Sequence, residues 1–289
     1  MTTLERASAG VLTAVDYPWI STPADPTTPE EHIYNSGKLI ERTSKFIQND
    51  EVLDLVNWGA GPKTARSGLS DKEFAADVGT FGIFVAISPA DLDLYRALLP
   101  EHFSLPSEPV VSLVNVDYNQ PNPIVRYKEG MVLLKAVAVN GVETWYCHSM
   151  PVETWLMMVM GHAWGFRKQL FDMTITRGKT TVLDKDGALY MELESTSSEW
   201  SDEADAIVPA GSIGGINDMS VICPKNTDLV LQFASESEAY ILDEDRRMVR
   251  ISVNRNLDWA GLIPEGAVAP GAYRRFVRAG GNSYIRKIR

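Results

Sequence analysis

The sequence has few cysteines, no long apolar run and a deficit of positive charge, and each shortage excludes a class of protein. Cys147 and Cys223 are its two cysteines, with no CxxC spacing for a metal site and too few thiols for a disulfide-rich secreted domain. The longest apolar stretch, near residues 155–161, is far shorter than the roughly 20 residues of a membrane-spanning helix. Acidic residues outnumber basic ones by 38 to 27, a net charge of −11 that disfavours nucleic acid and anionic membranes as partners.

Motifs for nucleotides, serine nucleophiles and metals are missing as well. Residues 178–180 (GKT) resemble the end of a phosphate loop, but Met173 stands where its first glycine belongs. Residues 210–214 form a glycine-rich loop without the strand–turn–helix context of a nucleophile elbow. The four histidines have no ligand spacing such as HExxH: His32, His102, His148 and His162. We therefore expect no metal and no bound cofactor.

The overall composition is that of a folded globular protein. Hydrophobic residues make up 45% of the 289 residues and charged residues 22%, which excludes general disorder. Residues 1–6 lack the apolar segment of a secretory signal. We expect a cytoplasmic protein with one large domain or two ordinary ones.

The first 75 residues differ in character from the rest. Prolines discourage regular structure up to Pro29, where residues 28–31 (TPEE) give an N-cap, a first-turn proline and a capping-box glutamate. The stripe of Ile33, Ile40 and Ile47 predicts a helix over 29–48, and a short second helix is expected over 51–57. Residues 1–75 are thus a helical extension that packs on the core or on a partner subunit.

Residues 76–289 have the pattern of a mostly antiparallel β domain. Strands are expected at 81–87, 110–118, 131–139 and 142–150, with Asn140-Gly141 as the turn of a hairpin. The region also predicts two helices and further hairpins: helices near 89–99 and 151–163, and hairpins at 174–183/188–194 and 229–242/248–253.

Lys168 is the main candidate for chemistry. It follows a strongly apolar helix and comes directly after Trp164 and Phe166. One interpretation is a lysine whose stem packs on the aromatic rings while its amine reaches water. The other is an amine held in a dry pocket, where the cost of desolvating the ammonium leaves a free amine that attacks carbonyl carbons.

A family resemblance favours the second interpretation. From Phe81 to about Leu170, the chain resembles the acetoacetate decarboxylase superfamily. The similar features are the helix-plus-proline segment at 98–101 (LLPE), the proline-led strand at 109–111 (PVV), and the segment 164–170 (WGFRKQL), which matches the family's aromatic-Pro-Lys-Lys-Leu signature. The resemblance implies that Lys168 is the imine-forming nucleophile. It also implies that Glu129, in residues 127–130 (YKEG), is the carboxylate that moves protons.

The chain departs from the family pattern next to this lysine. Gln169 replaces the second lysine, a cation that helps to keep the nucleophile neutral, and Arg167 stands at the proline position and is a candidate replacement for that cation. The family's Arg-Glu pair upstream reads Gly161-His162 here. No counterpart is found for the arginine that holds the substrate carboxylate. Several aromatic and polar residues are candidates for substrate binding: Trp164, Phe166, Arg167, Gln169, Tyr118, His148 and His162.

The resemblance implies an acetoacetate-decarboxylase-like antiparallel β-barrel with flanking helices and an N-terminal helical extension. It implies a lyase that forms a Schiff base with a small or medium keto acid, with decarboxylation of a β-keto acid favoured over aldolase–dehydratase chemistry. The alternative outside catalysis is a barrel that only binds an apolar carbonyl ligand. The expected partner is a small-molecule keto acid or aldehyde. We also expect a homo-oligomer, in which the basic tail 273–289 docks on an acidic body.

Overall fold

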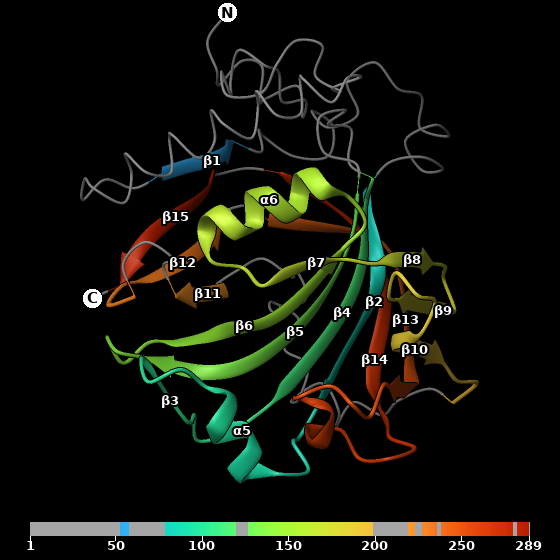
Figure 1. Ribbon diagram of the computed structural model, residues 1–289. Coiled ribbons are helices and arrows are strands. Elements are labelled where there is room, and N and C mark those ends of the chain that lie inside the picture. The colour runs from blue at the N-terminus through green and yellow to red at the C-terminus, as the bar shows by residue number, and fades with distance from the viewer. Residues whose placement is uncertain are drawn as a thin grey trace, which may run out of the picture.

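The computed structural model describes residues 53–57, 79–119, 127–198, 219–222, 227–235, 238–279 and 282–288. The helix expected over 29–48 lies outside these residues. The described chain forms a 15-stranded sheet with helices α5 (Leu92–Leu98) and α6 (Trp155–Trp164) and the 3-10 turn η3 (Ala260–Leu262), as Figure 1 shows.

The strands follow one another with short connections over most of the described chain. They are β1 Leu53–Asn57, β2 Gly79–Ile87, β3 Phe103–Ser104, β4 Val111–Asn119, β5 Tyr127–Ala138, β6 Glu143–Val152, β7 Lys168–Leu170, β8 Asp172–Ile175, β9 Lys179–Leu183, β10 Leu189–Ser195, β11 Met219–Ile222, β12 Val230–Ser235, β13 Glu238–Val253, β14 Val268–Ala279 and β15 Asn282–Ile288.

The sheet is mixed rather than wholly antiparallel. Its order is β1-β15-β12-β11-β6-β5-β4-β2-β14-β13-β10-β9-β8, with β3 on β5 and β7 on β6. β6 pairs in parallel with both β11 and β7. The mostly-β class is confirmed. Barrel closure is not seen: within the described residues the ladder ends at β1 and β8, and no pairing joins these two strands.

The hairpin turns at Asn140-Gly141 and Asp186-Gly187 are confirmed, whereas the hairpin expected over 229–242/248–253 is wrong, because β13 is a single strand over Glu238–Val253. Gly141 and Gly187 both have positive φ, 79° and 80°, which glycine adopts without steric cost at the turn after an Asn or Asp. The expected short helix at 51–57 is wrong, because Leu53–Asn57 is a strand paired with β15. β5 begins at Tyr127, earlier than expected, and this places Glu129 inside a strand.

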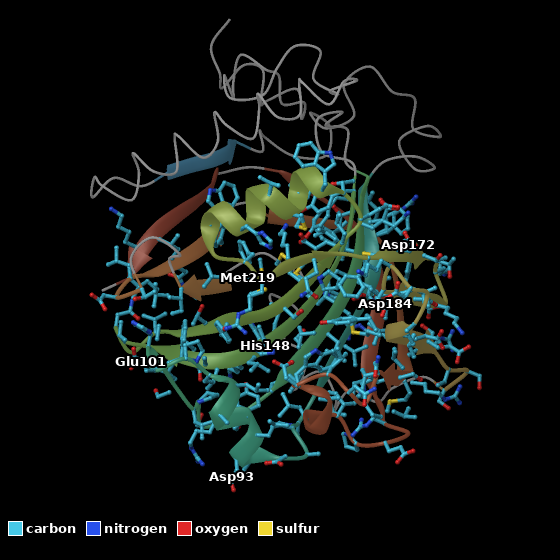
Figure 2. All side chains as sticks on the ribbon, in the orientation of Figure 1. Asp93, Glu101, His148, Asp172, Asp184 and Met219 are labelled. Atoms are coloured by element: carbon cyan, nitrogen blue, oxygen red, sulfur yellow. The ribbon has the colours of Figure 1, made fainter. Side chains whose placement is uncertain are left out.

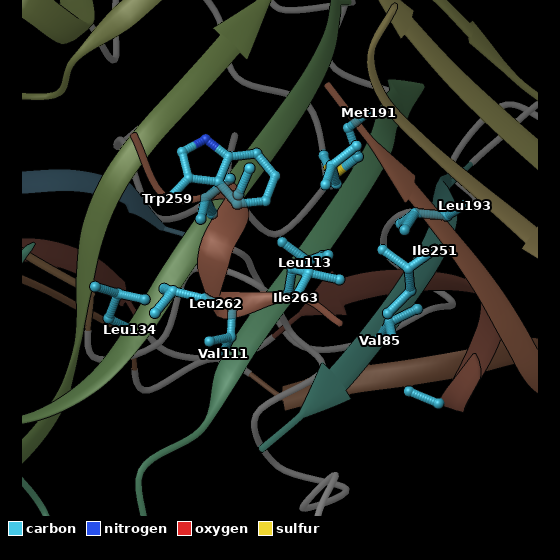
Figure 3. Close-up of a cluster of buried hydrophobic side chains, with 14 of the residues drawn as sticks. Val85, Val111, Leu113, Leu134, Met191, Leu193, Ile251, Trp259, Leu262 and Ile263 are labelled. Atoms are coloured by element: carbon cyan, nitrogen blue, oxygen red, sulfur yellow. The ribbon is translucent and has the colours of Figure 1, made fainter. Parts of the chain in front are cut away.

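The sheet buries apolar side chains on both faces, in two separate clusters. The first cluster contains α5, η3 and strands β8–β10, with Trp259, Leu113 and Met191 almost fully buried (Figure 3). The second cluster lies between the sheet and α6, and includes Phe84, Val116 and Phe233. Side chains alternate between the two faces along each strand, so neighbouring residues serve different cores.

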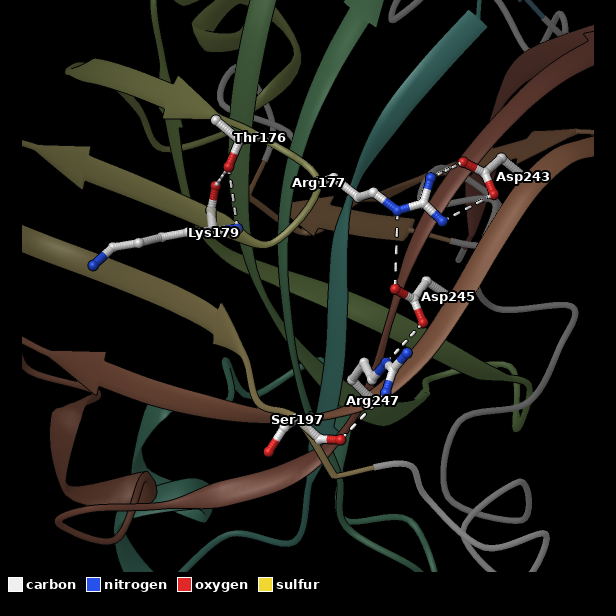
Figure 4. Close-up of polar contacts among 7 residues, drawn as sticks. All are labelled: Thr176, Arg177, Lys179, Ser197, Asp243, Asp245 and Arg247. Carbon is white, nitrogen blue, oxygen red and sulfur yellow. Dashed lines mark hydrogen bonds and ion pairs between the residues drawn. The ribbon is translucent and has the colours of Figure 1, made fainter.

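Charged side chains tie the turn between β8 and β9 to β13. Arg177 makes two hydrogen bonds to the Asp243 carboxylate, and its guanidinium lies 5.2 Å from the Tyr273 ring centroid. Arg247 binds Asp245 at 2.8 Å and the carbonyl of Ser197 at 3.2 Å (Figure 4). The contacts of Arg177 with Asp243 and of Arg247 with Ser197 join segments that are far apart in sequence, although partial exposure limits what each contributes to stability.

The basic tail is largely part of the sheet. Its described residues belong to β14 and β15, and β15 lies between β12 and β1. Arg274 is 3% exposed and forms an ion pair with Glu244 on β13. The tail therefore docks within the chain itself through strand pairing.

Candidate active site

A buried ion pair joins the two residues singled out by the sequence. Lys168 Nζ lies 2.5 Å from Glu129 Oε2, and the two side chains are 6% and 4% exposed. Burying two charges costs several kcal/mol per ion, which the pair recovers through close contact and further hydrogen bonds. A pair held in this way keeps an amine and a carboxylate within proton-transfer distance of each other.

The end of α6 sets the path of Lys168. Gly165 caps the helix in the left-handed conformation, at φ 96°, and the Phe166 amide donates to the carbonyl of Gly161 at 3.0 Å. The chain then turns back along β6, where Lys168 pairs with Met150. Lys168 thus points from β7 into the layer between α6 and the sheet.

Gly161 provides the space for the lysine stem. A Cβ at this position would lie 2.8 Å from Lys168 Cγ and closer still to Cδ, well inside van der Waals contact. The next residue, His162, holds the Lys168 backbone: its Nε2 lies 2.6 Å from the Lys168 carbonyl oxygen. Because a carbonyl only accepts, this contact assigns a proton to Nε2.

Glu129 has a second set of donors on the β4 side. The Tyr118 hydroxyl donates to Glu129 Oε1 at 3.4 Å, while Lys168 takes Oε2. Tyr127 shares the face of Glu129 two residues along β5, and its ring stacks on that of Tyr118 at 4.8 Å. Burial, with the negative charge of Glu129 next in importance, raises the pKa of Tyr127 well above its ordinary value. Its hydroxyl therefore stays protonated and remains a donor.

Aromatic rings surround the amine. Lys168 Nζ lies 5.6 Å from the ring centroid of Tyr127 and 5.8 Å from that of Phe166. Phe233 of β12 extends this wall, at 4.6 Å from Phe166 and 5.4 Å from Trp164. Ring faces at such distances attract a cation while excluding water.

Three predicted site residues lie elsewhere. Arg167 and Gln169, on either side of Lys168, are both exposed, as alternation along an extended segment requires. His148 (labelled in Figure 2) binds Asp258 at 3.2 Å and meets the Tyr146 ring edge-on, and neither contact involves Lys168 or Glu129. Burial lowers the pKa of His148, against the opposing effect of Asp258.

The sequence reasoning gave no role to Tyr127, Gly161, Phe233 or Cys147. The i, i+2 spacing of Tyr127 and Glu129 on a strand is a signal that predicts their common face. The Cys147 thiol is buried, and burial and the nearby carboxylate of Glu129 raise its pKa, so it stays a neutral part of the wall.

The described residues hold no group of three or more His, Cys, Asp or Glu side chains arranged to bind a metal ion. Within the same residues, neither helix is long and apolar enough to span a membrane.

A protein-family model matches the part of the chain that contains the candidate site. The model of the acetoacetate decarboxylase (ADC) family matches residues 63–210, about half of the chain and the part that includes Glu129 and Lys168. The chain belongs to the acetoacetate decarboxylase family. No curated protein sequence matches it.

Solved structures agree with this assignment at the level of the fold. Acetoacetate decarboxylase from Legionella pneumophila subsp. pneumophila str. Philadelphia 1 has a TM-score of 0.54 and 13% identity, covering 73% of this chain and 86% of that one. The enduracididine biosynthesis enzyme MppR complexed with pyruvate gives 0.52 and 15%, over 72% and 88%. An acetoacetate decarboxylase-like enzyme from Sphingomonas wittichii RW1 gives 0.51 and 12%, over 73% and 94%. Family membership indicates an enzyme of the acetoacetate decarboxylase type.

Proposed function

We propose that this protein is a lyase in which Lys168 forms a Schiff base with a small or medium keto acid, and that it decarboxylates a β-keto acid. The observation that supports this most directly is the buried contact of 2.5 Å between Lys168 Nζ and Glu129 Oε2. It provides a nucleophile and a proton carrier in a dry site, which are the two groups that imine chemistry requires.

The first half of the reaction makes the imine. Lys168 passes a proton to Glu129, and the free amine attacks the carbonyl carbon. A proton shift from nitrogen to oxygen gives the carbinolamine. The carbinolamine hydroxyl then takes the proton from Glu129 and leaves as water, so that a positively charged iminium and an ionised Glu129 remain.

The second half uses the iminium as an electron sink. The bond to the carboxylate breaks, CO2 leaves, and the electron pair moves into the iminium to give an enamine. Glu129, reprotonated from water, gives its proton to the enamine carbon. Water then hydrolyses the iminium, releasing the ketone and restoring the Lys168 ammonium. The faces of Tyr127 and Phe166 stabilise the cationic stages, each interaction contributing about 0.5–2 kcal/mol.

Aldolase–dehydratase chemistry is a second candidate that uses the same imine. Residue 169, where the family has its second lysine, is an exposed glutamine and places no cation beside Lys168. This departure from the decarboxylase pattern favours the second candidate. MppR, whose fold is similar, has been solved with the condensation product of pyruvate and imidazole 4-carboxaldehyde. Both reactions share the lysine and the carboxylate and differ in which bond of the iminium breaks or forms.

Borohydride trapping tests the proposal. The full chain is incubated with a β-keto acid and reduced, and the adduct is located by peptide mass spectrometry while CO2 release is measured in parallel. We expect the adduct on Lys168 and its loss, with turnover, in Lys168→Ala. Lys128→Ala is the matched control, since Lys128 lies beside Glu129 on β5 but pairs with Glu153. Turnover that survives Lys168→Ala contradicts the mechanism, and an adduct without CO2 release favours the second candidate.

A further inference from the structure

We propose that the carbonyl compound that reaches Lys168 carries an aromatic or conjugated group next to its carbonyl carbon. This inference rests on the imine chemistry proposed above and adds the class of substrate. It is drawn from the side chains that surround the amine on the face of the sheet covered by α6.

A continuous series of rings passes the amine. Tyr118 and Tyr127 stack at 4.8 Å with their planes 24° apart, and Tyr127 flanks Lys168 Nζ at 5.6 Å. Phe166 flanks the amine at 5.8 Å and contacts Phe233 at 4.6 Å. The amine therefore lies within 6 Å of a ring from each of two aromatic pairs: Tyr118 and Tyr127 on β4 and β5, and Phe166, just before β7, with Phe233 on β12.

The dimensions of an aryl imine match this arrangement. One C–N bond, one C–C bond and half a ring place the centre of an attached ring about 4 Å from Nζ. Aromatic pairs prefer centroid separations of roughly 4.5–7 Å, in offset or edge-on contacts. The centre of a ring bound to Lys168 thus lies at a distance from Nζ comparable to those of the Tyr127 and Phe166 rings, so contact with these rings is within its reach.

Methionine side chains make up much of the rest of this layer, and they can repack around a flat ligand. Five methionines belong to the second cluster or pack against it: Met131, Met150, Met157, Met158 and Met219, the last of which is labelled in Figure 2. Methionine has three rotatable bonds and a polarisable sulfur that contacts ring edges favourably, so it repacks around bound groups more easily than branched residues do.

Charge favours the same class of ligand. Glu129 and the two flanking ring faces stabilise the positive charge of the iminium. A conjugated group spreads that charge beyond the nitrogen, toward the rings that continue the wall, whereas an alkyl group of equal size does not. Contact between two aromatic rings adds to the binding free energy beyond the burial of apolar area. We therefore expect an aromatic ligand to be preferred about tenfold over a saturated ligand of the same size.

The test compares two aldehyde probes of equal size. Benzaldehyde and cyclohexanecarboxaldehyde are offered separately to the full chain with cyanoborohydride, and the label on the Lys168 peptide is quantified. Dividing each rate by that of Nα-acetyl-lysine removes the difference in intrinsic reactivity. We expect the corrected ratio to favour benzaldehyde about tenfold. Phe166→Leu and Tyr127→Leu should each lower this ratio toward one while labelling continues.

Phe103→Leu is the matched control, because Phe103 is buried in the first cluster, on the other face of the sheet, against Tyr146. It should leave the corrected ratio at the wild-type value. A wild-type ratio near one, with Lys168 still labelled, overturns the substrate class and leaves the imine mechanism standing. A ratio that both leucine variants leave unchanged also overturns it. Absence of any label on Lys168 with either aldehyde overturns the proposed function itself.

Discussion

Gly161 of α6 lies directly against the side chain of Lys168, and the stem of the lysine occupies the space where any other residue would place its Cβ. The absence of a Cβ atom at this position of the helix therefore sets where the lysine side chain lies. Nζ is held 2.5 Å from Glu129 because the stem runs past a bare glycine backbone.

Gly161→Ala should reduce turnover by about a hundredfold, the cost of a displacement of about 1 Å in a catalytic group. Stability should change little, since alanine favours helix by about 1 kcal/mol and offsets part of the local strain. Steady-state kinetics and thermal unfolding measure the two effects separately. Gly178→Ala is the control, because its Cβ would meet nothing within 4 Å, and equal losses in both variants would contradict the role of Gly161.

Glu129→Gln should still permit imine formation, at a reduced rate because the amide cannot take up the Lys168 proton, and should slow the later proton transfers by a factor on the order of 10²–10⁴. The amide keeps the shape of the side chain and one acceptor oxygen for Tyr118 or Lys168, but its NH2 group cannot accept a hydrogen bond and the side chain no longer carries a proton. Borohydride trapping reports the imine, and single-turnover kinetics report the later steps. Glu153→Gln, which affects the more exposed pair with Lys128, serves as the control. Complete loss of trapping together with turnover would contradict this expectation, because it would show that the imine does not form without Glu129.

His162→Phe should lower kcat about fivefold and leave KM nearly unchanged. The reason is the loss of the hydrogen bond that positions the Lys168 backbone, which contributes about 1 kcal/mol. The histidine acts on the Lys168 backbone, because its Nε2 lies 2.6 Å from the Lys168 carbonyl oxygen. His162→Gln retains a donor and should restore part of the rate. If glutamine and phenylalanine behave alike in kinetics, the hydrogen bond does not position Lys168.

Stability should fall as the pH drops below about 6.5, the ordinary pKa of histidine in an unfolded chain. Burial lowers the pKa of His148 in the folded protein, so below that pH the unfolded chain binds a proton that the folded chain resists. Melting temperatures at pH 7.5 and 5.5 measure the loss. His148→Gln should make the loss smaller, whereas His102→Gln should not, and an unchanged pH dependence in His148→Gln would remove His148 as its source.

The sequence alone determined the elements whose signals are local. Strand alternation, the Asn140-Gly141 and Asp186-Gly187 turns, and the apolar helix before Lys168 each depend on residues a few positions apart. These features follow from backbone preferences and periodicity, which act before any distant contact forms. The roles expected for Lys168 and Glu129 came instead from the resemblance to the acetoacetate decarboxylase family.

Tertiary structure decided what surrounds the amine. Glu129 and Lys168 are 39 residues apart, and strand register decides that they meet on one face. Phe233 joins them from β12, a strand in a separate part of the chain. Arg167 and Gln169 are adjacent to the nucleophile in sequence yet exposed, because a shift of one residue along a strand reverses the direction of a side chain. Such directions depend on pairing between distant segments, and no local pattern encodes them.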